Sequence, residues 1–179
     1  MERPHTIDTL YNDISTVYNS NMLHKEVEVY CLKCPYCGGK ARLRDYSFIY
    51  HNNKYKGKVF VCENFPKCDS YVGCHPNTTR PLGRLANKKL RHLKAKSHEW
   101  FDPLWKNRCF DHDKSMSKNR SLAYKWLASE LHLTDNQCHI GKFDAGTCQK
   151  IIKLCMKKQK EFGLYKDSPP FSRGYHKNN

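Results

Sequence analysis

Two pairs of cysteines with metal-ligand spacing flank one short stretch of the chain. The first pair lies in Cys34-Pro-Tyr-Cys37-Gly-Gly and the second in Cys62-Glu-Asn-Phe-Pro-Lys-Cys68. Zinc prefers four thiolate or imidazole ligands in a tetrahedron. A Cys-x-x-Cys turn directs two sulfurs to one point, and Gly38 supplies the positive φ that such a turn needs. We therefore predict one zinc ion held by Cys34, Cys37, Cys62 and Cys68.

Two other features compete for the ligand positions. Cys31 forms a second Cys-x-x-Cys with Cys34, and Cys74-His75 lies close enough in sequence to replace Cys62 or Cys68. The alternative to any metal site is two unrelated pairs of buried or reactive thiols. Four thiolates leave no open position for water, whereas a catalytic zinc needs one, so the predicted ion is structural.

The segment between the two pairs must bring them together. It is rich in Tyr, Phe, Ile and Val and is interrupted by His51-Asn-Asn-Lys. This pattern predicts a β-hairpin in which residues 41–50 pair with residues 55–62, with Asn52-Asn53 at the turn. Alternation along the first strand would place Tyr46, Phe48 and Tyr50 on one face.

After residue 83 the apolar residues change from alternation to helical spacing. A first helix carries Leu90, Trp100 and Phe101 on one face and is broken or restarted at Asp102-Pro103. Further helices are predicted to begin at the N-caps Ser117 and Asp144. The predicted fold class is α+β, a small four-cysteine zinc ribbon built on a β-hairpin and followed by a compact helical unit.

Four segments are expected along the chain. An N-terminal amphipathic helix occupies residues 1–26, the zinc ribbon 27–82, the helical domain 83–166 and a disordered tail 167–179. No run of about 18 apolar residues is present, and the N-terminus lacks the pattern of a secretory signal. We therefore expect a soluble protein of the cytoplasm with no membrane partner, where cysteines stay reduced and ligate metal or are buried.

The chain is strongly basic. It has 32 Lys and Arg against 17 Asp and Glu, which gives a formal charge of +15. Such a charge indicates a polyanionic partner, with nucleic acid first and an acidic protein or membrane surface second. Aromatic rings interleaved with cations in the hairpin suit stacking of unpaired bases. The predicted nucleic-acid-binding residues, in hairpin and helix, are Lys54, Lys56, Lys58, Arg84, Lys88, Lys89, Arg91 and Lys96; the alternative is a solvated basic helix face.

The cysteine motifs carry a local resemblance. Cys34-Pro-Tyr-Cys37-Gly-Gly with Phe60-Val-Cys62-Glu-Asn-Phe-Pro-Lys-Cys68 resembles the four-cysteine zinc ribbons at the C-terminal end of bacterial type IA topoisomerases. Those ribbons contact single-stranded DNA, so the resemblance implies a similar contact. It implies no topoisomerase chemistry, because the active site of those enzymes lies elsewhere.

A longer resemblance covers most of residues 34–155. Its motifs include Asp69-Ser-Tyr-Val-Gly73-Cys-His, His98-Glu-Trp-Phe-Asp-Pro-Leu-Trp105 and Cys138-His-Ile-Gly-Lys-Phe-Asp144. Together with the first cysteine pair they resemble a phage- and prophage-borne zinc-finger family without an established activity. The resemblance implies a zinc ribbon fused to a helical unit and a phage-encoded protein in the host bacterial cytoplasm.

Catalysis has three weak candidates. His98, His139 and Asp144 are residue types used by metal-dependent nucleases and general bases, but histidines at helix ends usually have structural roles. No P-loop, paired-carboxylate cluster or dinucleotide fingerprint is present. We therefore expect a nucleic-acid-binding protein that favours single-stranded or distorted DNA. The alternatives are an inhibitor or adaptor of a host protein and, as a third class, a metal-dependent nicking nuclease.

Overall fold

The computed structural model describes residues 32–51 and 55–164. The chain divides into two compact units, residues 1–88 and 89–179. The predicted N-terminal helix, the predicted tail, Cys31 and Lys54 lie outside the described residues. The first unit contains a small antiparallel sheet and the clustered cysteines. The regular elements in the described part of the second unit are helices. The predicted α+β class is therefore confirmed.

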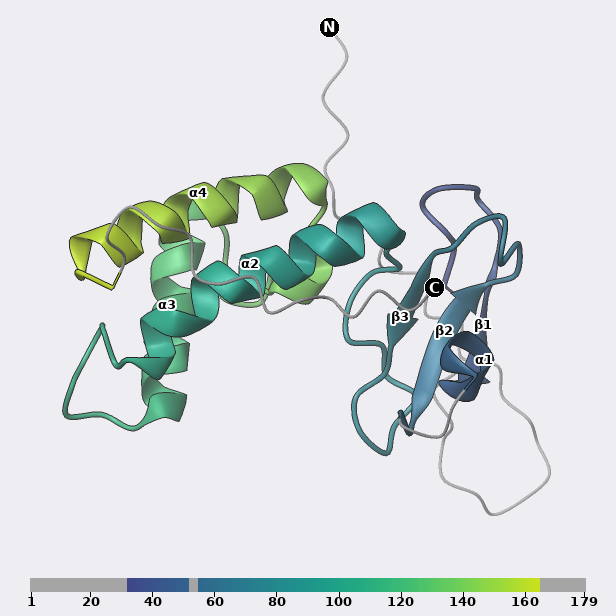
Figure 1. Cartoon of the computed structure of the whole chain (residues 1–179), viewed down its shortest axis with the longest axis horizontal. Coiled ribbons are helices and arrows are strands. Elements are labelled where there is room, and N and C mark those ends of the chain that lie inside the picture. The colour runs from purple at the N-terminus through teal and green to yellow at the C-terminus, as the bar shows by residue number, and fades with distance from the viewer. Residues whose placement is uncertain (1–31, 52–54, 165–179) are drawn as a thin grey trace, which may run out of the picture. The chain divides into compact units, whose positions relative to one another are not determined.

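The sheet of the first unit has three strands in the order β1-β2-β3 (Figure 1). Strand β1 spans Ala41–Asp45, β2 spans Lys58–Cys62 and β3 spans Tyr71–Gly73. Both pairings are antiparallel. Strand β2 is the central strand, and its residues from Val59 onward are buried. Its register places Cys62, the first cysteine of the second pair, opposite Ala41.

The predicted hairpin is shorter than expected, and one of its strands ends in a helix. Pairing stops at Asp45 and Lys58, whose side chains form an ion pair of 2.9 Å. Helix α1 (Ser47–Tyr50) follows, so the prediction of a strand over residues 41–50 is wrong after Asp45. Tyr46 has helical backbone angles, and a helix places residues four apart on one side.

The aromatic side chains therefore do not share a strand face as predicted. The Tyr46 and Tyr50 rings stack with their centroids 5.9 Å apart, and Tyr55 lies 4.6 Å from Tyr50. Phe48 is directed to a different neighbour, Phe65. Ring packing within this cluster is a tertiary interaction that alternation along the sequence does not reveal.

Strand β3 was not predicted, because three residues are too few to show a period. Two isolated antiparallel bridges connect this strand and the residue after it to the following loop. They pair Tyr71 with Ala86 and Cys74 with Pro81. One cluster of buried residues in this unit surrounds the cysteines and is made of Cys34, Ala41, Phe60, Cys62, Cys74 and Leu85. Val59 and Val61, which alternate with Phe60 and Cys62 along β2, are buried outside this cluster. One part of the sheet core is therefore also the environment of the cysteines.

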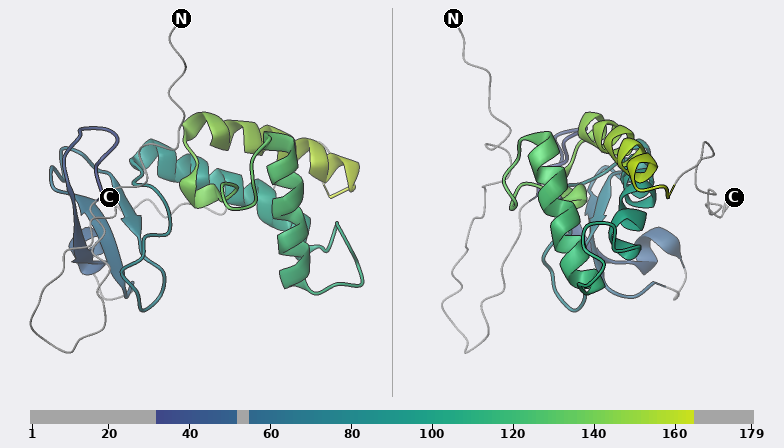
Figure 2. Two further views of the ribbon diagram at one scale, coloured as in Figure 1. Left: turned by 180° about the vertical axis from the view of Figure 1, so that it is seen from behind. Right: turned by 90° about the vertical axis from the view of Figure 1, so that its left-hand side faces the viewer.

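The described part of the second unit is built from three long helices. Helix α2 spans Lys88–Lys106, α3 spans Met116–Leu131 and α4 spans Ala145–Glu161, with a short 3₁₀ helix, η2, at Ile140–Lys142. Helices α2 and α4 lie side by side in the views of Figures 1 and 2. None of the helices in the described part of the chain is long and apolar enough to cross a membrane.

Helix α2 continues through Pro103, so the predicted break at Asp102-Pro103 does not occur. Proline removes one backbone hydrogen bond of a helix. Buried side chains on either side, Phe101 and Leu104, anchor the last turns and offset that loss. Tertiary packing here outweighs the local preference of proline.

Of the two predicted helix N-caps, one is confirmed and the other is wrong by two residues. The Asp144 side chain caps α4 by accepting a hydrogen bond of 2.8 Å from the Thr147 amide, as predicted. Helix α3 is capped by Ser115, two residues before the predicted Ser117. Its start is further fixed by the fully buried Asn119, whose amide donates to the Asp111 carbonyl at 2.7 Å.

The core of the helical unit is apolar with a few satisfied polar groups. Its largest fully buried side chains are Phe101, Leu104, Leu127, Ile140 and Ile151. Buried Ser97 of α2 donates to the Leu93 and Cys148 carbonyls, and buried Gln159 of α4 donates to the Trp100 carbonyl. Because buried polar groups are costly unless they are paired, the Ser97–Cys148 and Gln159–Trp100 bonds stabilise the packing of α2 against α4.

Candidate metal centre

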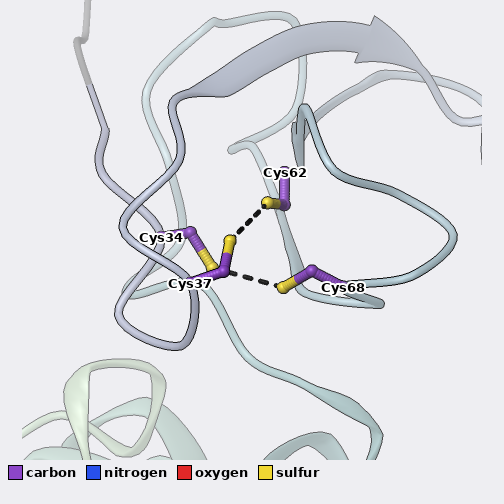
Figure 3. A group of neighbouring side chains, drawn as sticks. All are labelled: Cys34, Cys37, Cys62 and Cys68. Carbon is purple, nitrogen blue, oxygen red and sulfur yellow. Dashed lines mark hydrogen bonds between the residues drawn. The ribbon is translucent and has the colours of Figure 1, made fainter.

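The first cysteine pair lies on a tight turn just before β1. The Gly38 amide donates to the Cys34 carbonyl at 2.9 Å, and the Cys34 amide donates to the Gly39 carbonyl at 2.7 Å. Gly38 has a φ of +72°, a conformation that side-chain-bearing residues rarely adopt. This turn directs the Cys34 and Cys37 sulfurs to the same side of the chain (Figure 3).

The second pair is placed by the end of β2 and the loop after it. Cys62 is the last residue of β2, and the loop folds back because the Cys68 amide donates to the Asn64 carbonyl at 2.9 Å. The β1–β2 register then sets Cys62 beside the first turn. The sheet thus positions the two turns, and each turn aims its own two sulfurs.

The four sulfurs form one compact cluster (Figure 3). All four lie within 4.8 Å of one another, with 3.3 Å between Cys37 and Cys62 and 3.5 Å between Cys34 and Cys68. A tetrahedral zinc ion with Zn–S near 2.3 Å requires sulfurs separated by about 3.8 Å. The observed spacing and the all-thiolate donor set therefore fit one structural zinc ion.

The alternative zinc ligands considered from the sequence are separate from this cluster or lie outside the described part of the chain. Among the described residues the four cysteines are the only group of three or more His, Cys, Asp or Glu whose ligand atoms converge. Buried Cys74 contacts the Thr79 carbonyl at 3.5 Å, and His75 lies beside Arg80. Cys31 is outside the described residues.

Hydrogen-bond donors around the cluster stabilise the thiolate form of the cysteines. The Ser70 hydroxyl, fully buried, lies 2.9 Å from the Cys34 sulfur and 3.4 Å from that of Cys68. The Asn64 side-chain amide donates to the Cys37 sulfur at 3.4 Å. Metal-bound thiolates only accept hydrogen bonds, so the Ser70 hydroxyl donates when zinc is present. Neither residue was predicted from the sequence to serve the site, although Asn64 is part of the second cysteine motif.

The two most closely spaced thiols have opposite environments. The Asn64 amide, the Gly39 N–H and neighbouring thiols lower the pKa of exposed Cys37 to about 6. Burial raises the pKa of Cys62 to about 12. A cation at the centre of the cluster stabilises the thiolate form of all four, including those that burial keeps protonated in its absence.

The predicted nucleic-acid-binding residues differ in how accessible their charges are. Lys58 pairs with Asp45, and Lys96 pairs with Glu99 at 2.8 Å. Lys88 and Lys89 are exposed at the start of α2. Lys56 is also exposed, whereas Arg84 and Arg91 are partly buried. The structure therefore leaves Lys56, Lys88 and Lys89 as the predicted cations with the most accessible charge.

His98, His139 and Asp144 each have a structural role. His98 Nδ1 lies 3.4 Å from Asp102 Oδ1 on the same helix. His139 Nδ1 accepts a hydrogen bond from the Gly141 amide, and Asp144 caps α4. In the part of the chain that the structure describes, these three do not form a converging metal-ligand group.

A surface of cations and rings in the zinc-binding unit was not predicted from the sequence, and we term it the Arg–Phe surface (Arg42, Arg44, Phe48 and Phe65). The Arg44 guanidinium lies 5.6 Å from the centre of the Phe48 ring, and the Phe48 and Phe65 rings are 5.8 Å apart. A hollow of about 150 Å³ lies among these side chains, and its lining also includes Val61, Cys62 and Glu63. The Glu63 carboxylate pairs with Arg42 at 3.6 Å, so Arg44 is the cation of this surface that has no acidic partner among the described residues. Phe48 is 44 % exposed, although it is aromatic. The sequence could have shown that Arg42 and Arg44 lie on one face of a strand, because they are two residues apart. Their proximity to Phe65 could not be predicted, because it depends on the tertiary fold.

The fold and the site define a small α+β zinc-binding protein with an all-cysteine structural site. The chain belongs to a family described as a zinc-finger-containing domain, whose model matches residues 30–159. This match spans both units and includes all four clustered cysteines. Neither the comparison with curated proteins nor that with solved structures gives a match.

Proposed function

We propose that this protein binds nucleic acid, with single-stranded or distorted DNA preferred, and that the Arg–Phe surface of the zinc-binding unit carries the contact. The observation that supports this most directly is the exposed Phe48 ring between Arg44 and Phe65. Unpaired bases stack on aromatic rings, and guanidinium groups both stack on bases and bind phosphate. Paired bases within a regular duplex do not offer their faces to such a surface.

The start of α2 supports the same proposal. Lys88 and Lys89 are exposed there, and the first turn contains no acidic residue. Cations at the start of a helix are opposed by its dipole, so they weaken rather than strengthen α2. Asp69 partly offsets this by accepting a hydrogen bond of 2.8 Å from the Lys88 amide. Lys88 and Lys89 therefore stand where their charges weaken the helix, which is consistent with a role in binding.

The test is fluorescence anisotropy of labelled single-stranded and duplex DNA, measured over a range of salt concentrations. We expect tighter binding of the single strand and a salt slope of about −0.7 for each phosphate contacted. Phe48→Leu keeps an apolar side chain but removes the ring, and we expect it to weaken single-strand binding by about 5-fold or more. Arg44→Gln should reduce the salt slope by about one phosphate contact.

Lys150→Gln provides the matched control, because it removes one exposed charge from α4 in the other unit. It should change affinity far less than Arg44→Gln. Salt-insensitive binding, or equal losses in all three variants, would show that the Arg–Phe surface is not the contact.

The resemblance to a phage- and prophage-borne family supports a further proposal, that the protein is phage-encoded and acts in the cytoplasm of a host bacterium. Its DNA target would then be either phage or host DNA. Cell fractionation of an infected or induced host, with detection of the protein in the soluble fraction, tests the location.

A host-protein partner is the second candidate. The observation that favours it is an aromatic cluster in the helical unit, where Phe110 packs against Trp126 and Phe162 with centroid distances of 5.9 and 5.8 Å. Phe162 and Leu164 are each 39 % exposed. Exposed apolar groups of this kind are used in protein interfaces. Capture of one bacterial protein that survives nuclease treatment and is lost in Phe162→Ser would favour this candidate.

A further inference from the structure

A second recess lies in the helical unit, apart from the zinc site and the Arg–Phe surface. It has a volume of about 450 Å³ and lies between α3 and the segment before η2. Its lining residues are Ser117, Arg120, Ser121, Tyr124, Lys125, Asp135, Cys138 and His139. The α3 members are spaced so that they share one face of that helix. This volume is within the range of small-molecule sites.

The lining combines cations with stacked rings. Tyr124 and His139 lie nearly parallel, with ring centroids 5.7 Å apart and an interplanar angle of 14°. The Arg120 guanidinium lies over the Tyr124 ring at 5.5 Å and over Trp105 at 5.8 Å. Arg120 and Lys125 are the two lysine or arginine residues of the lining, and Asp135 is its one carboxylate. Two cations against one carboxylate leave the recess with an excess positive charge.

Tyr124 forms the inner wall of the recess. Its ring also packs against buried Phe101, with the ring centroids 4.6 Å apart. The Tyr124 hydroxyl is buried, so a ligand in the recess does not reach it. His139, by contrast, is exposed and lines the recess.

We propose that this recess binds a nucleotide, with its phosphate at Arg120 and Lys125 and its base against the exposed ring of His139, which stacks on Tyr124. Guanidinium groups bind phosphate through paired donors, and a flat base suits an exposed aromatic ring. Asp135 accepts hydrogen bonds from a sugar hydroxyl or a base amine, which inorganic phosphate lacks. This site does not depend on the Arg–Phe surface, and it adds a small-molecule ligand to the proposed function.

The test is titration of the full zinc-loaded chain with dAMP, adenosine and inorganic phosphate by calorimetry. We expect dAMP to bind at least 10-fold more tightly than either adenosine or phosphate alone. Arg120→Met should weaken dAMP binding by at least 10-fold, while Lys150→Met, which removes an exposed charge outside the recess, should leave it unchanged. Phe48→Leu should also leave dAMP binding unchanged, so failure of this proposal and failure of the Arg–Phe contact are distinguishable.

His139→Asn supplies a second measurement that does not depend on how well the Arg120 variant folds. It keeps a side-chain acceptor for the Gly141 amide but removes the exposed ring, so it should leave thermal stability nearly unchanged while weakening dAMP binding by about 5-fold. Unchanged dAMP affinity in a folded His139→Asn chain would overturn the role of the ring. Absence of dAMP binding at millimolar concentration, or equal affinity for dAMP and adenosine, would overturn the site.

Discussion

The hydroxyl of Tyr46 lies against the α-carbon of Gly73, so closely that a β-carbon at Gly73 would overlap it. Tyr46 precedes α1, and Gly73 is the last residue of β3, opposite Val59 of β2. The contact therefore fastens the connection between β1 and β2 to the third strand. It explains why a residue without a side chain occurs in a strand, where glycine is otherwise unfavourable.

Gly73→Ala should destabilise the zinc-binding unit by about 1–3 kcal/mol, because the added methyl group forces the Tyr46 ring aside. Combining it with Tyr46→Phe should recover part of this loss, since the overlapping oxygen is removed while the ring carbon would lie 3.3 Å away. Hydrogen exchange of β2 and β3 amides measures the effect. Gly146→Ala in α4 is the control, because its β-carbon meets only an ordinary contact at 3.8 Å, and it should be neutral or stabilising.

Removing one cysteine of the cluster should remove the zinc. Cys34→Ser should reduce zinc from one ion per chain to well below one and unfold the first unit, because metal binding supplies much of the folding free energy of small zinc sites. Cys109→Ser, at a half-buried cysteine outside the cluster, should retain one ion. Elemental analysis of both variants, with amide NMR spectra of the first unit, is the measurement. Full zinc content in Cys34→Ser would contradict the assignment.

Ser70→Ala should weaken zinc binding by about 10- to 100-fold, the effect typical of losing a hydrogen bond to a metal ligand. The Cys34 thiolate loses the buried hydroxyl that lies 2.9 Å away. Competition with a chromogenic chelator measures the affinity. Ser47→Ala, at an exposed serine of the same unit, should have no effect, and an equal change in both variants would rule out a specific role for Ser70.

Acid should weaken the helical unit through Asp102. Burial raises the pKa of this carboxyl, but hydrogen bonds from His98 and Lys106 outweigh it and hold the pKa at about 2. The pKa is lower in the folded than in the unfolded state, so the carboxylate stabilises the fold above about pH 4, and this stability is lost as the pH falls towards 2. Its contribution is about 1 kcal/mol, because the group is partly exposed and screened by solvent.

Urea unfolding followed by tryptophan emission measures this effect, because all three tryptophans lie in α2 and α3 and report on the helical unit alone. Asp102→Asn should be less stable than the unmodified chain at pH 7, and the difference should shrink by pH 2.5. Asp113→Asn, at an exposed loop carboxylate, is the control. A difference that does not change with pH would contradict the electrostatic origin.

Local sequence patterns predicted much of the fold. The paired cysteines, the glycine after Cys37 and the Asp144 cap act within a few residues of themselves, so their spacing alone predicts what they form. The same is true of the helical period that follows residue 83. The strand over residues 41–50 and the break at Asp102-Pro103 were predicted wrongly, because ring packing around Tyr46 and the burial of Phe101 and Leu104 decide those segments.

The amino-acid sequence by itself determined the metal-ligand chemistry, because thiolates in two closely spaced pairs favour zinc whatever surrounds them. Only the tertiary structure decided which groups serve that chemistry and which surfaces stay open. Ser70 lies against Cys34, Arg44 and Phe65 lie around Phe48, and Tyr124 stacks on His139 only after the chain has folded. Such contacts join residues that are distant in the chain, and their energies depend on burial and orientation, which spacing along the sequence does not contain.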